Sequence, residues 1–252
     1  MNNIIKLNKK YSYNNLVNDL YFLNYIYKEL IIKNIGKTNL NRKIFAIKIG
    51  NGNKKILIKT TEKANESILA SCMLSFIEEL MQKNTKKELY KGYEIEKILN
   101  ENTIYFIPMV NPDGVGLVLR EKEILLNKKY KNIWEKYNQI LELWNANIRG
   151  VDLEYNYKQI WENNSKKIFK KEFTKPNYKM FPGINYLSEI ECINIEKFIK
   201  IMKIKKIITI KLFGNKKHLL NNKKIKEMLE ENILELIEKE KYVENCNTNF
   251  VD

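Results

Sequence analysis

The segment Lys63-Ala-Asn-Glu66 has residue types and a spacing that could support chemistry at the end of a strand. It follows an apolar, strand-like run at 55–59 and opens a helix-like run at 66–80. The carboxylate of Glu66 could bind a metal ion, or it could interact favourably with the positive end of a helix dipole. The one histidine, His218, lies far along the chain. A single histidine among scattered carboxylates gives little support to a zinc site.

Further motifs follow in order along the chain. They are Asn111-Pro-Asp-Gly114, the segment 146–156 that contains Arg149, and Phe181-Pro-Gly183 followed by Ser188-Glu189. Together with residues 63–66, this series resembles the zinc carboxypeptidase family, the carboxypeptidase A-like metallopeptidases. The similarity is greatest to the branch that cleaves bacterial cell-wall peptides, the γ-D-glutamyl-diamino acid peptidases. It covers about residues 10–245.

The resemblance implies a zinc site whose histidines are replaced in this chain. The family's first motif reads His-Ala-Asn-Glu, so Lys63 stands at the first histidine position and Glu66 is the only retained ligand position. Matching Gly214 to the glycine of the family's later His-x-x-Gly places Lys211 at the other histidine position. A protonated ammonium group cannot coordinate zinc, so we expect no bound cofactor, although Zn²⁺ is the family cofactor. We expect Lys63, Glu66 and Lys211 to form an ion cluster instead, because an unpaired buried carboxylate is costly.

Other positions match residues that handle the substrate in the family. Arg149 matches the arginine that polarises the scissile carbonyl and stabilises the oxyanion, a role that is vestigial if the protein is inactive. Glu154 falls at an asparagine that helps to bind the substrate's terminal carboxylate, which a second carboxylate would repel. Tyr155 follows, where carboxypeptidases carry an arginine, and Asn111 belongs to a loop that shapes the site.

The family also uses a general-base glutamate on a late strand that reads roughly Thr-x-Glu. After about residue 240 this sequence offers no such motif, and the surroundings of Glu244 do not match it. Loss of a general base costs orders of magnitude in rate. The resemblance therefore predicts a domain that is shortened at its C-terminal end and lacks the base.

Strand-like and helix-like segments alternate, which predicts an α/β fold with a twisted mixed β-sheet flanked by helices, in one domain over residues 1–252. We expect strands at 43–50, 54–59, 103–109 and 205–212, and helices at 12–30, 65–83, 131–144, 188–203 and 222–240. Ser12 should cap the first helix. The turn residues 51–53 (Asn-Gly-Asn) predict that the first two strands form a hairpin.

Composition limits the class of partner. The net charge is +15, but the chain has few arginines and its lysines are scattered, which favours a generally basic, solvated surface over nucleic-acid binding. Cys72, Cys192 and Cys246 form no CxxC pair, and the first two lie in helix-like apolar patterns, so we expect free thiols in a reducing compartment. The N-terminus lacks the apolar run of a signal peptide, and no stretch approaches the roughly 20 apolar residues of a membrane span. These features predict a cytoplasmic protein with no membrane partner.

We therefore expect a zinc-carboxypeptidase-like protein that is non-catalytic, with a peptide or a cell-wall stem peptide as its candidate partner. Two alternatives stay open. One is an active metallocarboxypeptidase with a non-standard zinc site made by Glu66, His218 and another carboxylate. The other is a basic scaffold that binds anionic polymers through its lysines.

Overall fold

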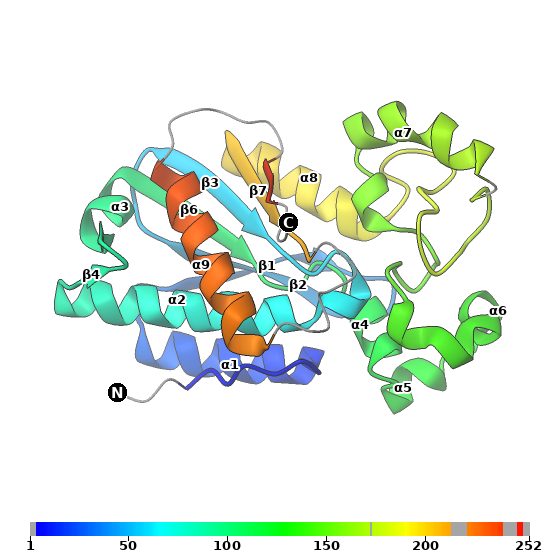
Figure 1. Ribbon diagram of the computed structural model, residues 1–252, viewed down its shortest axis with the longest axis horizontal. Helices are drawn as coiled ribbons and strands as arrows, with labels where there is room; N and C mark the ends of the chain where they lie inside the picture. The colour runs from blue at the N-terminus through cyan, green and yellow to red at the C-terminus, as the bar shows by residue number, and fades with distance from the viewer. Residues whose placement is uncertain (1–3, 172, 213–220, 239–245, 249–252) are drawn as a thin grey trace.

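The computed structural model describes residues 4–171, 173–212, 221–238 and 246–248. A six-stranded sheet in the order β1-β2-β6-β3-β7-β8 forms its centre, with helices on both faces (Figure 1). The strands are β1 (Ile31–Lys37), β2 (Lys43–Ile49), β3 (Lys54–Lys59), β6 (Asn102–Ile107), β7 (Lys206–Ile210) and β8 (Cys246–Thr248). This mixed sheet confirms the predicted α/β class.

The sheet divides into an antiparallel part and a parallel part. β1, β2 and β6 pair antiparallel, whereas β6, β3, β7 and β8 run parallel. All six residues of β6 are buried, as expected for a strand that is covered on both faces. Because β3 and β7 are parallel neighbours, with Lys59 opposite Thr209, the loops that follow them leave the same edge of the sheet.

The predicted hairpin between 43–50 and 54–59 is wrong. β6 lies between these two segments and pairs with both. The glycine at 52 serves a different purpose, because a Cβ atom there would lie 1.9 Å from the carbonyl carbon of Glu101. Gly52 lets the connection pass close against the chain just before β6. The glycine therefore marks a close backbone approach and not the predicted tight turn.

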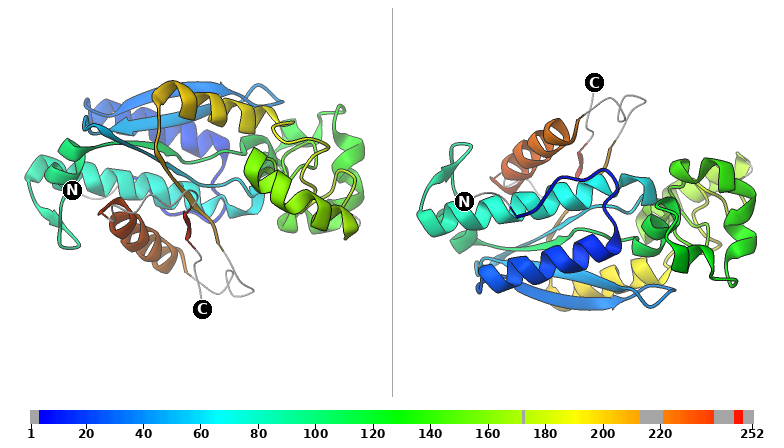
Figure 2. Two further views of the ribbon diagram at one scale, coloured as in Figure 1. Left: turned by 90° about the horizontal axis from the view of Figure 1, so that it is seen from above. Right: turned by 90° about the horizontal axis from the view of Figure 1, so that it is seen from below.

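Helices cover the two faces unequally. The helices α1 (Tyr13–Ile26), α2 (Ile68–Lys86) and α9 (Asn222–Glu238) pack into one core with alternate strand residues such as Ile56 and Ile58. The opposite face packs Leu57 against α8 (Ile190–Met202). Figure 2 shows α8 and α9 on opposite sides of the sheet. The period-two alternation of buried strand residues is what allows both layers.

Most predicted helices are present, with changes at their ends. Ser12 caps α1 in a capping box with Asn15, as expected. The helix ends at Ile26, before the predicted end at residue 30. The strand β1 that follows was not predicted. The predicted helix at 131–144 is α6 followed by a 3₁₀ segment. The predicted helices at 188–203 and 222–240 correspond to α8 and α9, and the predicted strand at 205–212 corresponds to β7. Residues 239 and 240 lie outside the described part.

The remaining elements connect this framework. They are η1 (Ala64–Glu66), β4 (Leu89–Tyr90), β5 (Tyr93–Glu94), α3 (Ile95–Glu101), α4 (Pro112–Val118), α5 (Lys122–Leu125), α6 (Lys131–Trp134), η2 (Glu135–Leu143), η3 (Leu153–Tyr155) and α7 (Lys158–Lys170). Cys72 and Cys192 are buried free thiols, as expected, whereas the side chain of Cys246 lies outside the described part. Among the described helices, none has both the length and the apolar character that crossing a bilayer requires.

Candidate functional site

Three loops bring the candidate site together at the carboxyl edge of the parallel strands. Lys63 lies on the loop after β3 and immediately precedes η1, which ends with Glu66. Lys211 is the first residue after β7, and Glu154 is the middle residue of η3. The carboxyl ends of neighbouring parallel strands are where α/β folds commonly assemble functional side chains.

One carboxylate joins the two lysines. The Nζ atom of Lys211 lies 2.6 Å from Oε1 of Glu154, and the Nζ atom of Lys63 lies 3.2 Å from Oε2 of the same residue. The three side chains are only 5%, 15% and 13% exposed for Lys211, Lys63 and Glu154. We call Lys63, Glu154 and Lys211 the lysine–glutamate bridge. Both oxygens of Glu154 are engaged, so the bridge is a compact buried ion triad.

Glu66 lies beside this bridge and is 1% exposed. Burial disfavours the charge of Lys63, but the neighbouring carboxylates of Glu154 and Glu66 outweigh it, so the pKa of Lys63 is raised. Lys63 therefore stays protonated at neutral pH. The sequence predicts that Lys63 and Lys211 cluster around Glu66. In the structure the carboxylate that contacts both lysines is Glu154, which the prediction did not include.

A second buried ion pair extends the bridge along β3. The Nζ atom of Lys59 lies 2.5 Å from Oε1 of Glu62, and both side chains are buried. Burial alone would raise the pKa of Glu62, yet the charges of Lys59 and Lys211 hold it below its usual value. Positive and negative charges thus alternate from Lys59 through Glu62, Lys211 and Glu154 to Lys63. The sequence analysis missed Lys59 and Glu62, although a Lys-x-x-Glu spacing at the end of an apolar strand was visible.

Asp152 is a further buried acid beside the bridge. It is 1% exposed, and its Oδ2 atom accepts a hydrogen bond from the N–H of Met180 at 3.0 Å. Burial, followed by the charge of Glu154, raises the pKa of Asp152 to about 6. Asp152 fixes the 180 loop beside the bridge.

Arg149 is the accessible cation of the site. Its side chain is 45% exposed, and its Nε atom lies 3.8 Å from Oε2 of the buried Glu189. The Nδ2 atom of Asn147 donates to Glu189 at 2.7 Å and to Oε2 of Glu191 at 3.4 Å, while Asn147 Oδ1 accepts from the N–H of Arg149. Burial, followed by the charges of Glu189 and Asp113, raises the pKa of Glu191 to about 8. These contacts hold Arg149 at the surface of the site.

The other predicted substrate positions differ in accessibility. Asn111 is fully buried; its Nδ2 donates to the backbone oxygens of Glu62 and Ala146, and its Oδ1 accepts from the N–H of Gly114. Its amide therefore supports the loops around the site. Tyr155 is half-buried, and burial with the charge of Glu154 raises its pKa to about 12.

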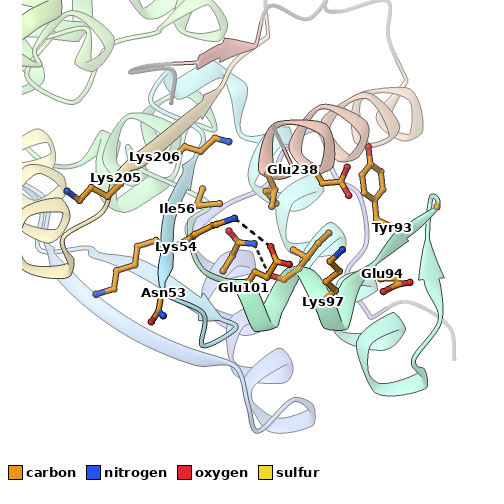
Figure 3. Close-up of a pocket in the computed structure, with 15 residues that line it drawn as sticks. Asn53, Lys54, Ile56, Tyr93, Glu94, Lys97, Glu101, Lys205, Lys206 and Glu238 are labelled. Carbon is orange, nitrogen blue, oxygen red and sulfur yellow. Dashed lines mark hydrogen bonds and ion pairs between the residues drawn. The ribbon is translucent and has the colours of Figure 1, made fainter. Parts of the chain in front are cut away.

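Two cavities border the sheet at different places. A cavity of about 540 Å³ is lined by Lys59, Glu62, Glu154 and Lys211 and so adjoins the bridge. A larger cavity of about 900 Å³ lies at the opposite, amino-terminal ends of the parallel strands (Figure 3). Its walls come from β3, α3, β5 and the end of α9, away from the predicted site residues. The site residues Glu154 and Lys211 therefore line the smaller cavity and not the larger one.

Zinc, the cofactor implied by the resemblance, does not fit the described residues at these positions. A zinc site needs imidazole, thiolate or carboxylate donors, whereas Lys63 and Lys211 present ammonium groups that already bind Glu154. Within the described ranges, no group of three or more His, Cys, Asp and Glu side chains could hold a metal ion. His218 and Glu244 lie outside those ranges, so the alternative site that includes His218 stays a prediction.

The sequence relatives agree with the motifs. Residues 22–231 match the family model described as zinc carboxypeptidase. The chain is 34% identical over 157 residues to gamma-D-glutamyl-L-diamino acid endopeptidase 1 of Lysinibacillus sphaericus, covering 61% of this chain and 39% of that protein. It is 32% identical over 178 residues to the uncharacterized protein YqgT of Bacillus subtilis strain 168, covering 66% of this chain and 44% of that protein. The matched region thus spans less than half the length of these relatives.

Solved structures agree on the fold. Thrombin-activatable fibrinolysis inhibitor matches with a TM-score of 0.59 at 17% identity, over 94% of this chain and 58% of that one. Carboxypeptidase A from Helicoverpa armigera matches with a TM-score of 0.57 at 16% identity, over 94% of this chain and 57% of that one. The shared architecture and the family match over residues 22–231 lead to one assignment: the chain belongs to the zinc carboxypeptidase family.

Proposed function

We propose that this chain is a non-catalytic member of the zinc carboxypeptidase family, in which the lysine–glutamate bridge stands in place of the metal and the domain binds peptides without cleaving them. The observation that carries the proposal is the position of Glu154, whose two oxygens contact Lys63 and Lys211. Both lysines fall where the resemblance implies zinc-binding histidines.

The three substitutions compensate one another electrostatically. Two lysines without Glu154 would lose the carboxylate that contacts both of them. A glutamate at 154 without the lysines would bury a further carboxylate beside Glu66 and Asp152. Removing one partner from a buried ion pair leaves an uncompensated charge, which is strongly destabilising. Lys63, Glu154 and Lys211 therefore replace the metal site together, and their ion pairs hold the same loops in place.

The bridge also removes the chemistry that the family reaction requires. Metal-assisted hydrolysis needs a cation that polarises the scissile carbonyl and lowers the pKa of a bound water. An ammonium group can donate hydrogen bonds, but it cannot coordinate and ionise water in this way. The donors of Lys63 and Lys211 also point at Glu154. This arrangement supports binding without turnover.

Arg149 supports a retained binding role. Its guanidinium group is nearly half exposed and lies beside the buried carboxylate of Glu189. Asn147 bonds both to Glu189 and to the backbone N–H of Arg149, and so positions the arginine. A planar guanidinium group is well suited to peptide carbonyl and carboxylate oxygens. Because one relative is a γ-D-glutamyl-L-diamino acid endopeptidase, we infer that the ligand is a peptide with a γ-D-glutamyl-diamino acid linkage.

Binding and cleavage of such a peptide test the proposal together. We expect calorimetric titration to show binding, and mass spectrometry of the same mixture with added zinc to show intact peptide. Arg149→Gln should weaken binding by about tenfold or more, as for loss of one charged hydrogen bond. Arg120→Gln is the matched control, because Arg120 contacts Asn138 on the surface. Zinc-dependent cleavage would refute the non-catalytic assignment, whereas absence of binding would refute the peptide-binding role.

A further inference from the structure

The outward face of α1 carries a group of exposed apolar side chains. Its inward residues Leu16, Leu20 and Leu23 are buried in the core. The exposed apolar residues are Val17 (37% exposed), Tyr21 (69%), Phe22 (49%), Tyr25 (66%) and Ile26 (43%). We call these five residues the α1 face. Seen from below in Figure 2, α1 lies along the outside of the molecule.

The α1 face lies on a helix whose exposed positions carry no formal charge. These positions are Asn14, Asn15, Val17, Asn18, Tyr21, Phe22, Asn24, Tyr25 and Ile26. The one charged residue of the helix, Asp19, is half-buried and accepts a hydrogen bond from the hydroxyl of Tyr11 at 2.5 Å. In α9, by contrast, every exposed described position is a lysine or a glutamate. For a chain with 30% charged residues, an uncharged aromatic helix face is a local exception.

We propose that the α1 face is the contact surface between two copies of this chain, packed helix against helix around a twofold axis. Depletion of charge and enrichment of aromatic residues characterise the centre of protein–protein interfaces. A twofold contact must be self-complementary. Tyrosine hydroxyl and asparagine amide groups each donate and accept hydrogen bonds, so two identical α1 surfaces can satisfy one another.

The spacing of the side chains suits such packing. Val17, Tyr21 and Tyr25 follow one another at intervals of four residues, as do Asn18, Phe22 and Ile26. These rows form two adjacent i±4 ridges, which can interdigitate with the same ridges of a second helix. The rings of Tyr21 and Phe22 already pack edge to face with centroids 5.9 Å apart.

The charge pattern favours a second copy over other occupants. The exposed positions of α1 include no lysine or arginine. Lys28, whose Nζ atom lies 4.9 Å from the centroid of the Tyr25 ring, is a single cation beside this face, whereas nucleic acid or an anionic membrane would require a cluster of them. Pairing through the edge strand β1 is disfavoured, because the strand exposes Lys33 and Lys37, and lysines on an edge strand oppose edge-to-edge pairing. The other exposed aliphatic residues of the described part lie on different segments; they are Ile31, Leu89, Leu126, Leu143, Ile184 and Ile201.

A contact of this kind has a characteristic salt dependence. Two copies that each carry a net charge of +15 repel one another at long range, and the α1 face itself offers no ion pairs to be screened. Added salt shortens the Debye length to about 8 Å at 0.15 M and so reduces the repulsion. Association should therefore strengthen as salt rises, the reverse of an interface held by ion pairs.

Analytical ultracentrifugation over a range of protein and salt concentrations tests the proposal. We expect a monomer–dimer equilibrium for the wild-type chain that shifts towards dimer with salt. Asn18→Lys, which removes no apolar group, and the double variant Tyr21→Lys, Tyr25→Lys should each weaken the dimer by more than about 30-fold. Ile201→Lys, an equally exposed apolar position elsewhere, should leave it unchanged.

Two outcomes would overturn the proposal. One is a wild-type chain that stays monomeric across the whole range. The other is a dimer that survives Asn18→Lys, which would mean that a different surface mediates the contact. Circular dichroism should show unchanged thermal unfolding of Asn18→Lys under conditions where both chains are monomeric, so a loss of dimer is not mistaken for a loss of fold.

Discussion

The Nζ atom of Lys211 lies 2.6 Å from Oε1 of Glu154, although 57 residues of chain separate them. The other oxygen of Glu154 contacts Lys63, so one carboxylate joins the loops that follow β3 and β7 through η3. The resemblance implies that these loops supply metal ligands in the family. Here an ion triad connects the same loops.

Glu154→Gln should destabilise the protein, because it leaves Lys63 and Lys211 close together without their shared counter-ion. Removing one partner of a buried ion pair costs about 3–5 kcal/mol. Because Lys63 and Glu154 are slightly exposed, we expect the free energy of unfolding to fall by about 3 kcal/mol. Urea denaturation measures it. Glu135→Gln is the control, because it disrupts the exposed Lys131–Glu135 pair and should change stability by less than about 0.5 kcal/mol. Equal effects of the two variants would contradict a structural role for the bridge.

Histidines at positions 63 and 211 should be tolerated, and should bind zinc, only when residue 154 is changed with them. Lys63→His with Lys211→His leaves Glu154 buried without either ammonium partner, so this double variant should unfold at lower denaturant than the wild type. Adding Glu154→Asn should recover stability. The triple variant should also gain measurable zinc affinity through two imidazoles and Glu66. If the double variant is as stable as the triple variant, the three positions are not coupled and the compensation argument fails.

Glu191→Gln should change the pH dependence of stability. Burial, followed by the charges of Glu189 and Asp113, raises the pKa of Glu191 in the folded chain from its usual value of 4.5 to about 8. Between these two values the unfolded chain releases a proton that the folded chain retains. The contribution of Glu191 to stability should therefore be fully present below about pH 4.5 and fall as pH rises towards 8, by at most about 1.4 kcal/mol per pH unit.

The variant removes this titration, so its stability relative to the wild type should increase from pH 5 to pH 8. Denaturant midpoints at both pH values measure the difference. Arg149 and Asn147 also face this acid pair through Glu189. Glu189→Gln should reproduce only part of the effect, because burial and not the charge of Glu189 is the largest cause of the raised pKa of Glu191. Parallel pH profiles for wild type and Glu191→Gln would show that Glu191 titrates normally.

The family and the sheet class could be predicted from the sequence, because they depend on motifs and on the periodicity of apolar residues. The assignment of Lys63 and Lys211 to the family's histidine positions stays a prediction, and the structure places both lysines beside Glu154. Ser12 was identified as a cap because its signal is local. The role of Glu154 could not be read in this way. Its sequence neighbours give no indication of Lys63 and Lys211, which reach it only through the fold, and the resemblance suggested only that it would repel a carboxylate.

The errors in the sheet have a similar origin. Gly52 carries a turn signal, but the partner that requires a glycine is the backbone at Glu101, which lies next to it only in the folded chain. β1 escaped detection because it is an edge strand in which Lys33, Asn34 and Lys37 are exposed, so the alternation of apolar residues is weak. Local propensity cannot distinguish such a strand from a loop.

A crystal structure grown in the presence of Zn²⁺, with anomalous data collected at the zinc edge, tests the central claim most directly. We predict no anomalous peak within coordination distance of Glu66 and continuous density between Glu154 and both lysine side chains. A fully occupied zinc ion bound to Glu66, with Lys63 and Lys211 displaced from Glu154, would contradict it.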